Sequence, residues 1–277
     1  MADKKAGSAF HVPVYTAMPP AASKVAGVPF APHYLDGAPI EEVDTIRVVG
    51  DAEIGVQSVS VASDFNSAID LPAASGTRHK IAGGGSPTAS LVAGDARGLV
   101  RVTTGAVAGN DAIIVYNGAD QPIPAATSGK RAWLTASVQV VDGLTDGAVL
   151  IGLAPNNVVD MDAEPVDGLY FYKANAASDF KVVARKNSAS TTIVSAVYAA
   201  AGKTLDTNLH EYSVHINEAG GIHVYLDGVL VGLLGAGDAN IPYTPTGNPL
   251  TLVIGRSTQS AAARNLQVDY YLVGQEV

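Results

Sequence analysis

The sequence contains no cysteine and few charged residues. Because none of its 277 residues is cysteine, disulfide bonds, thiolate-ligated metals, iron–sulfur clusters and thiol catalysis are all excluded. Charged residues make up 16% of the chain, whereas an average soluble domain has about 25%. Glycine (29 residues) and proline (15 residues) are abundant instead, and both favour frequent turns over long helices.

Basic residues are not in surplus, and the sequence has no long apolar run. The formal net charge is −9, and no basic cluster is longer than a pair such as Lys4-Lys5 or Arg185-Lys186. Nucleic acid is therefore not an expected partner. No run of about 18 apolar residues occurs, and the first residues lack the apolar core of a secretory signal. We expect a soluble protein with no membrane-spanning segment and no export signal.

The first 45 residues differ from the rest of the chain, because they hold 6 of the 15 prolines. Proline fixes φ and lacks an N–H donor, so residues 1–45 are expected to run extended and irregular. They also carry apolar and aromatic side chains, in which disordered tails are poor. We interpret them as a docking arm with the candidate contacts Phe10, Val12, Val14, Tyr15, Phe30 and Tyr34. Docking on the same chain, docking on a neighbouring subunit or another protein, and disorder all stay open.

Residues 46–277 have the pattern of a single all-β domain. Short β-branched and alternating runs are bounded by Gly, Asn, Asp and Pro, and no segment shows a helical stripe. Regularly spaced short strands of this kind are typical of a sandwich. The expected strands are 46–49, 54–61, 98–104, 112–116, 133–141, 147–153, 168–173, 180–185, 191–198, 211–216, 221–226, 229–234, 250–254 and 266–273. Residues 71–93 are expected to form a loose connection with at most two short strands.

One hairpin can be predicted with its register, because the apolar residues of 212–216 and 222–226 alternate. The expected buried pairs are Ile216–Ile222, Val214–Val224 and Tyr212–Leu226, and the pairs on the other face are His215–His223 and Ser213–Tyr225. Asp227-Gly228, which follows, is a strong signal for a two-residue turn.

Few side chains form a pattern that predicts catalysis. The acidic run 160–165 does not fit an EF-hand, because Pro165 and Phe171 occupy the positions of the required Gly and Glu. A solvated acidic loop is the favoured interpretation. No strand carries the alternating carboxylates of a jelly-roll glycosidase, so we expect no enzyme activity. The His215–His223 pair lacks an identifiable third zinc ligand.

Aromatic residues supply the remaining candidates for a binding surface. Trp133, the only tryptophan, begins a strand, and a core position is favoured over a role as a sugar platform. Tyr270 and Tyr271 occupy both faces of the last strand, so one of them must point outward. We expect that tyrosine to make a surface or interface contact.

The segment HEYSVHINEAGGIHVYLDGVLVGLL (210–234) resembles the late strands of concanavalin A-like, laminin-G-like jelly rolls. In such domains a strand ending in a pattern like "fyiDG" precedes a strand that begins "lv". The corresponding residues here are Ile222, Val224, Tyr225, Leu226, Asp227, Gly228, Val229 and Leu230. Residues 152–154, 167–172, 98–105 and 268–271 are similar to strands of such domains in tailed-phage virion proteins.

The resemblance implies a concanavalin A-like jelly-roll β-sandwich with an extended N-terminal arm. It also implies a non-enzymatic capsid decoration (cement) protein, made in the host cytoplasm and located on the virion. The expected partners are the major capsid protein and further copies of the chain, as a trimer. The alternative is a glycan-binding, lectin-like module of a phage fibre or receptor-binding protein. No cofactor is expected, although related domains sometimes bind calcium through loop carboxylates. The candidate ligands here are Asp160, Asp162, Glu164 and Asp167.

Overall fold

The structure is a computed structural model, and it describes part of the chain. The described residues are 46–49, 57–63, 79–92, 99–116, 131–155, 157–158, 160–217, 219–242 and 250–276. The predicted docking arm, with all six of its candidate contacts, lies outside the described residues.

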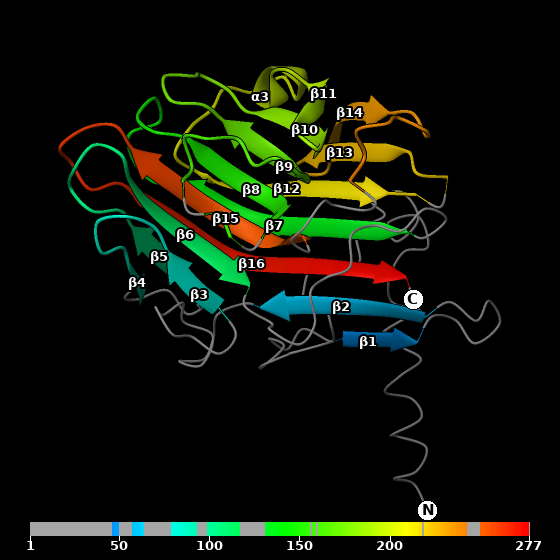
Figure 1. Ribbon diagram of the computed structural model, residues 1–277, viewed down its shortest axis with the longest axis horizontal. Coiled ribbons are helices and arrows are strands. Elements are labelled where there is room, and N and C mark those ends of the chain that lie inside the picture. Colours follow the sequence, from blue (N-terminus) through cyan, green and yellow to red (C-terminus); the bar gives the residue numbers. More distant parts are fainter. Residues whose placement is uncertain are drawn as a thin grey trace, which may run out of the picture.

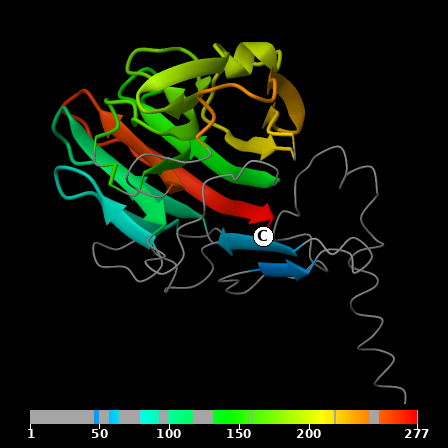
Figure 2. The ribbon, with the colours of Figure 1, turned by 45° about the vertical axis from the view of Figure 1, so that its right-hand side comes forward.

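The protein is an all-β sandwich of two antiparallel sheets (Figures 1 and 2). Sheet A has nine strands, in the order β1-β2-β16-β7-β12-β13-β14, with β5 paired to β16 and β4 to β5. Its strands are β1 (Ile46–Val49), β2 (Gln57–Ser63), β4 (Thr88–Leu91), β5 (Val100–Thr103), β7 (Ala132–Val140), β12 (Leu209–Ile216), β13 (Ile222–Leu226), β14 (Val229–Leu234) and β16 (Asn265–Glu276). Sheet A therefore joins segments from both ends of the described chain.

Sheet B has seven strands, in the order β11-β10-β9-β8-β15-β6-β3. Its strands are β3 (His79–Ala82), β6 (Asn110–Tyr116), β8 (Val149–Pro155), β9 (Gly168–Lys173), β10 (Lys181–Lys186), β11 (Ala189–Val194) and β15 (Leu250–Thr258). In the described part of the segment 71–93, residues 79–92, the structure has the two short strands β3 and β4, in agreement with the prediction. No helix in the described part of the chain is long and apolar enough to cross a membrane.

The main core lies between the two sheets and follows from strand alternation. Along β7, the even-numbered residues from Ala132 to Val140 are buried in this core, because successive side chains of a strand point to opposite faces. Aromatic rings fill the space near β9 and β12, where the Phe171 and Tyr212 ring centroids are 5.2 Å apart. The hydroxyls of Tyr198 and Tyr212 share a buried hydrogen bond of 2.7 Å.

The outer face of sheet B is also covered, by the loop between β8 and β9. Met161 of this loop is fully buried in a second apolar cluster, together with Leu150 and Tyr170. The loop is fixed by Tyr172, whose hydroxyl donates to the carbonyl of Met161 at 3.2 Å. Sheet B is therefore apolar on both faces in its centre, whereas the outer face of sheet A carries polar and aromatic side chains.

The predicted hairpin is confirmed residue by residue. β12 and β13 pair in the predicted register, and the residues predicted to be buried are at most 3% exposed. Asp227 and Gly228 have φ values of 50° and 76°, as a type I′ turn requires at both central positions. Gly228 supplies the second of these left-handed conformations at no steric cost.

Two predicted strands need correction. The strand predicted for 191–198 ends at Val194 and is followed by the one-turn helix α3 (Val197–Ala200). The carboxylate of Asp179 accepts the backbone N–H groups of Tyr198 and Ala199 at 2.9 and 3.0 Å, and it thereby holds this turn in place. Of the strand predicted for 54–61, residues 54–56 lie outside the described residues, and β2 contains the rest and continues to Ser63.

Candidate functional site

A cavity lined by described residues, between the sheets at one end of the sandwich, is too small for a ligand. Its volume is about 10 Å³, which is close to the minimum for one water molecule. Its inner walls are the apolar side chains of Ala132, Leu134, Leu153, Leu169, Val214 and Ile216. A sugar or an organic cofactor does not fit there, so a binding site must be sought on the surface.

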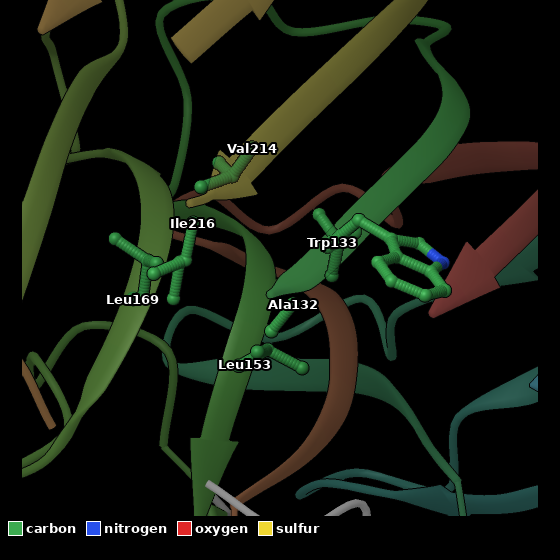
Figure 3. A pocket seen from close by; sticks show the side chains of 7 residues that line it. Ala132, Trp133, Leu153, Leu169, Val214 and Ile216 are labelled. Atoms are coloured by element: carbon green, nitrogen blue, oxygen red, sulfur yellow. The ribbon is translucent and has the colours of Figure 1, made fainter. Parts of the chain in front are cut away.

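Trp133 points away from this cavity, onto the outer face of sheet A. Figure 3 shows its indole ring directed away from the apolar residues around Leu153 and Ile216. The prediction that Trp133 lies in the core is therefore wrong. Its neighbours Ala132 and Leu134 lie in the core, and because side chains alternate along a strand, Trp133 points to the outer face. It pairs with Gly274 of β16, whose lack of a side chain leaves room for the indole.

Trp133 is half-buried, and its Nε1 atom is a buried donor. Among the described residues, this N–H has no hydrogen-bond acceptor. A buried donor without a partner costs about 1–3 kcal/mol, and such groups are rare in folded proteins. An acceptor supplied from outside the chain would satisfy it.

Two histidines continue the row that Trp133 begins. His215 of β12 pairs with Trp133 on one side and with His223 of β13 on the other. The two imidazole centroids are 6.1 Å apart, with ring planes at 73°. We call the three residues Trp133, His215 and His223 the ring ladder. It crosses three adjacent strands, and all three side chains are half-buried.

Polar side chains flank the ring ladder on the same face. The next row across the sheet contains Ser213 and Tyr225, and burial raises the pKa of Tyr225. One row further, Tyr270 donates its hydroxyl proton to the Glu211 carboxylate. The outer face of sheet A thus combines aromatic rings with hydroxyl, imidazole and carboxylate groups.

Tyr270 corrects the expectation for the two tyrosines of the last strand. Tyr271 is fully buried in the core, and a register shift between Val268 and Tyr270 turns Tyr270 to the outer face. However, Tyr270 is only 6% exposed. Its hydrogen bond to Glu211 makes it part of the sheet surface rather than a free contact residue.

The calcium candidates are held apart by separate contacts. Glu164 forms an ion pair of 2.5 Å with Lys181, Asp162 accepts from Ser257 at 2.8 Å, and Asp167 accepts the Asn187 N–H at 2.8 Å. Asp160 accepts the N–H of Asp162 at 2.9 Å. Within the described ranges, no three or more His, Asp or Glu side chains are grouped so as to hold a metal.

The acidic run 160–165 is solvated in part, as predicted, because Asp160 and Asp162 are exposed, whereas two nearby carboxylates are not. Asp167 is only 1% exposed, and the Glu164 side chain is 25% exposed. Both carboxylates bind groups of β10 or of the turn that follows it. The acidic residues therefore fasten the loop that covers sheet B.

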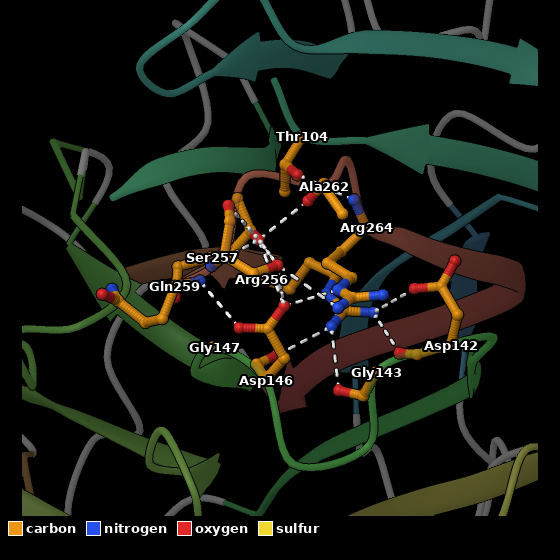
Figure 4. Close-up of polar contacts among 12 residues, drawn as sticks. Thr104, Asp142, Gly143, Asp146, Gly147, Arg256, Ser257, Gln259, Ala262 and Arg264 are labelled. Atoms are coloured by element: carbon orange, nitrogen blue, oxygen red, sulfur yellow. Dashed lines mark hydrogen bonds and ion pairs between the residues drawn. The ribbon is translucent and has the colours of Figure 1, made fainter. Parts of the chain in front are cut away.

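A second polar cluster, at the end of the sandwich where β7, β15 and β16 meet, was not predicted from the sequence (Figure 4). Its centre is Arg256, which is fully buried. Its terminal nitrogens donate to the backbone carbonyls of Asp142 (2.9 Å), Asn265 (2.8 Å), Asp146 (3.0 Å) and Gly143 (3.3 Å). Burial lowers the pKa of Arg256 to about 10.

The carboxylate of Asp146 completes this cluster. Burial alone would raise its pKa, but hydrogen bonds from Ser260 and Arg264 hold the pKa at about 2. Apart from Arg256 Nε, which has no hydrogen-bond partner among the described residues, these groups bind one another and fix the β7–β8 connection to β15 and β16. The cluster is therefore structural, and the outer face of sheet A is the candidate functional site.

Comparison with known proteins establishes the fold. No family model matches the sequence, and no curated protein matches it. A protein of unknown function from Shewanella oneidensis MR-1 has a TM-score of 0.52 at 12% identity, over 94% of this chain and 95% of that one. A structure from work on endo-acting O-glycanases of the human gut microbiota, described as initiating mucin breakdown, has a TM-score of 0.51 at 13% identity. It covers 76% of this chain and 97% of that one. At these identities the similarity defines a jelly-roll-like β-sandwich and no activity.

Proposed function

We propose that the protein binds glycans on the outer face of sheet A, with the ring ladder as the platform. The observation that carries this proposal is the unsatisfied Nε1–H of Trp133, buried at the start of a row of three aromatic rings. A sugar hydroxyl is an acceptor for this donor. The apolar C–H face of a pyranose packs on rings of this kind, while polar neighbours fix its orientation.

Neighbouring side chains supply the polar contacts that sugar recognition needs. The half-buried side chains of Tyr225 and Glu211 follow the ring ladder row by row, whereas Ser213 and Tyr270 beside them are buried. The sandwich similar to this chain that is described in connection with O-glycanases supports a glycan as the ligand class. We propose binding alone, without bond cleavage.

The single tryptophan of the chain makes the test specific, because its fluorescence reports on the ring ladder alone. A glycan array, with and without calcium, identifies ligands, and a fluorescence titration measures their affinity. Trp133→Phe keeps a ring but removes the donor, and its affinity on the array is expected to fall about 3- to 10-fold, the value of one hydrogen bond of about 0.5–1.5 kcal/mol. Trp133→Ala should abolish binding.

The control variant is Val107→Ala, which changes a side chain that is 63% exposed and remote in sequence from sheet A's central strands. It should bind like the wild type. Absence of binding to every glycan class, or wild-type affinity in Trp133→Ala, would contradict the proposal.

Capsid decoration is the second candidate function, and the apolar and aromatic residues among the prolines of residues 1–45 favour it. In this function the arm binds the major capsid protein and the virion is the location. The test is co-sedimentation with particles stripped of the protein, using the full chain and a chain that lacks residues 1–44. Equal pelleting of both forms would rule out docking by the arm.

A further inference from the structure

Strand β14 forms one edge of sheet A and is unusually apolar for an edge. Its sequence is VLVGLL, and Val229, Leu230 and Leu233 are 43%, 48% and 59% exposed. Among the described strands, only β13 pairs with it. Natural proteins protect such edges with lysine, other charges, proline or bulges; β14 has a register shift against β13 but no charge and no proline. An open, uncharged edge strand is a template for pairing with another strand.

Pairing with β13 fixes the direction of each β14 side chain. Leu230 lies opposite Tyr225 and Leu233 opposite His223, so both leucines are on the outer face of sheet A. A register shift in this hairpin places them on one face although they are three positions apart. Val229 and Leu234 lie opposite the core residues Leu226 and Ile222, on the other face.

We propose that β14 pairs antiparallel with β14 of a second copy, about a two-fold axis between Val231 and Gly232. In this register Leu230 lies opposite the partner's Leu233, and Leu233 opposite the partner's Leu230. Val229 lies opposite the partner's Leu234. Each pair joins two apolar side chains that already point to the same face, as an antiparallel ladder requires.

The strand is thus complementary to itself, which is the property of an isologous interface. A second copy fits this edge better than an unrelated strand, because the register satisfies both faces at once. No charge lies on β14 itself, so no facing pair within the two strands joins like charges. The dimer would join two copies of sheet A into one continuous sheet.

The dimer does not depend on glycan binding, but it would affect how tightly a glycan is bound. The outer faces of two sheets joined edge to edge point to the same side. Two ring ladders on one continuous surface would bind a repeating glycan with higher avidity than one.

The first test is the mass of the full-length protein in solution, measured by light scattering and sedimentation velocity from micromolar to sub-millimolar concentration. The wild type is expected to be a dimer. Leu233→Lys, which places a charge at the centre of the interface, should be monomeric. Leu91→Lys is the matched control, because Leu91 is 44% exposed on another short strand of sheet A, and it should remain dimeric. A monomeric wild type, or the same mass for both variants, would overturn the proposal.

The second test examines the register and uses the absence of cysteine from the chain. Cα atoms of facing residues in antiparallel strands are about 4.5–5.5 Å apart, within the range of about 4.4–6.8 Å that disulfides span. Leu230→Cys and Leu233→Cys should therefore form a disulfide-linked dimer when the two variants are mixed and oxidised, and not when either is oxidised alone. Crosslinking of each variant with itself but not in the mixture would refute this register.

Discussion

Replacement of Arg256 by methionine is expected to destabilise the sandwich strongly. Arg256 is fully buried at the point where the β7–β8 connection meets β15 and β16. Methionine keeps an apolar chain of similar reach but donates no hydrogen bond. The four carbonyls that now accept from the guanidinium would lose this donor inside the fold.

The magnitude follows from these contacts. A hydrogen bond to a charged group contributes about 1.5–3 kcal/mol, but four bonds to one guanidinium are not additive. A buried acceptor left without a donor costs about 1–3 kcal/mol, and for four such acceptors, which are not additive, we expect the free energy of unfolding to fall by about 3–5 kcal/mol. The pKa of about 10 leaves Arg256 protonated at neutral pH, so its charge is present in the wild type.

The assay is equilibrium unfolding in guanidinium chloride, followed by the fluorescence of Trp133. Lys203→Met is the control, because the Lys203 side chain is 38% exposed and pairs with Asp227 at the surface; its loss should cost less than about 1 kcal/mol. Arg256→Lys keeps the charge but has fewer hydrogen-bond donors, so its free energy of unfolding should fall by less than that of Arg256→Met. It replaces the methionine variant in the test if that variant does not fold. A loss below about 1 kcal/mol in Arg256→Met, or equal losses in the methionine variants, would refute the reasoning.

Three further changes test other parts of the structure. Burial raises the pKa of Asp111 to about 6, so its ionisation opposes folding, and the stability that it supports below pH 4 is lost as the pH rises through 6. This loss amounts to at most about 3 kcal/mol of the free energy of unfolding. Asp111→Asn should remove it, which unfolding curves measured between pH 4 and pH 7 would show. Asp179→Ala removes the acceptor that holds α3 and should cost about 0.5–2 kcal/mol, with faster amide exchange in 197–200 as the readout. Gly152→Ala would place a Cβ 2.4 Å from Tyr170 Cβ, so its melting temperature should fall, whereas Gly228→Ala meets no atom within 4 Å and should lose only about 1–2 kcal/mol of backbone energy.

The elements that could be predicted from the sequence are those whose structure depends on residues close together in the chain. The β12–β13 register could be predicted because a shift by one residue would expose Val214 and Val224, and the next turn because Asp-Gly tolerates positive φ. The type of fold followed from many strands of this kind. No long-range contact was needed for either result.

The errors arose where distant residues decide the structure. Residues 197–198 look like a strand, but Asp179 accepts the N–H groups of Tyr198 and Ala199 and fixes a helical turn. The core position of Trp133 was assigned from its residue type, whereas the phase of β7 places it outside. Arg256 had no local signal, because its partners come from segments up to 114 residues away.

The covered outer face of sheet B has a consequence for how the molecule opens. Every residue of β8 and β9 is buried, on both faces of the sheet, while β4 and β14 are largely exposed. Local opening releases edge strands at small free energy, but central strands exchange their amide hydrogens only when the whole domain unfolds. β8 and β9 would therefore be the last strands to exchange in heavy water, and their rate would report the global stability of the sandwich.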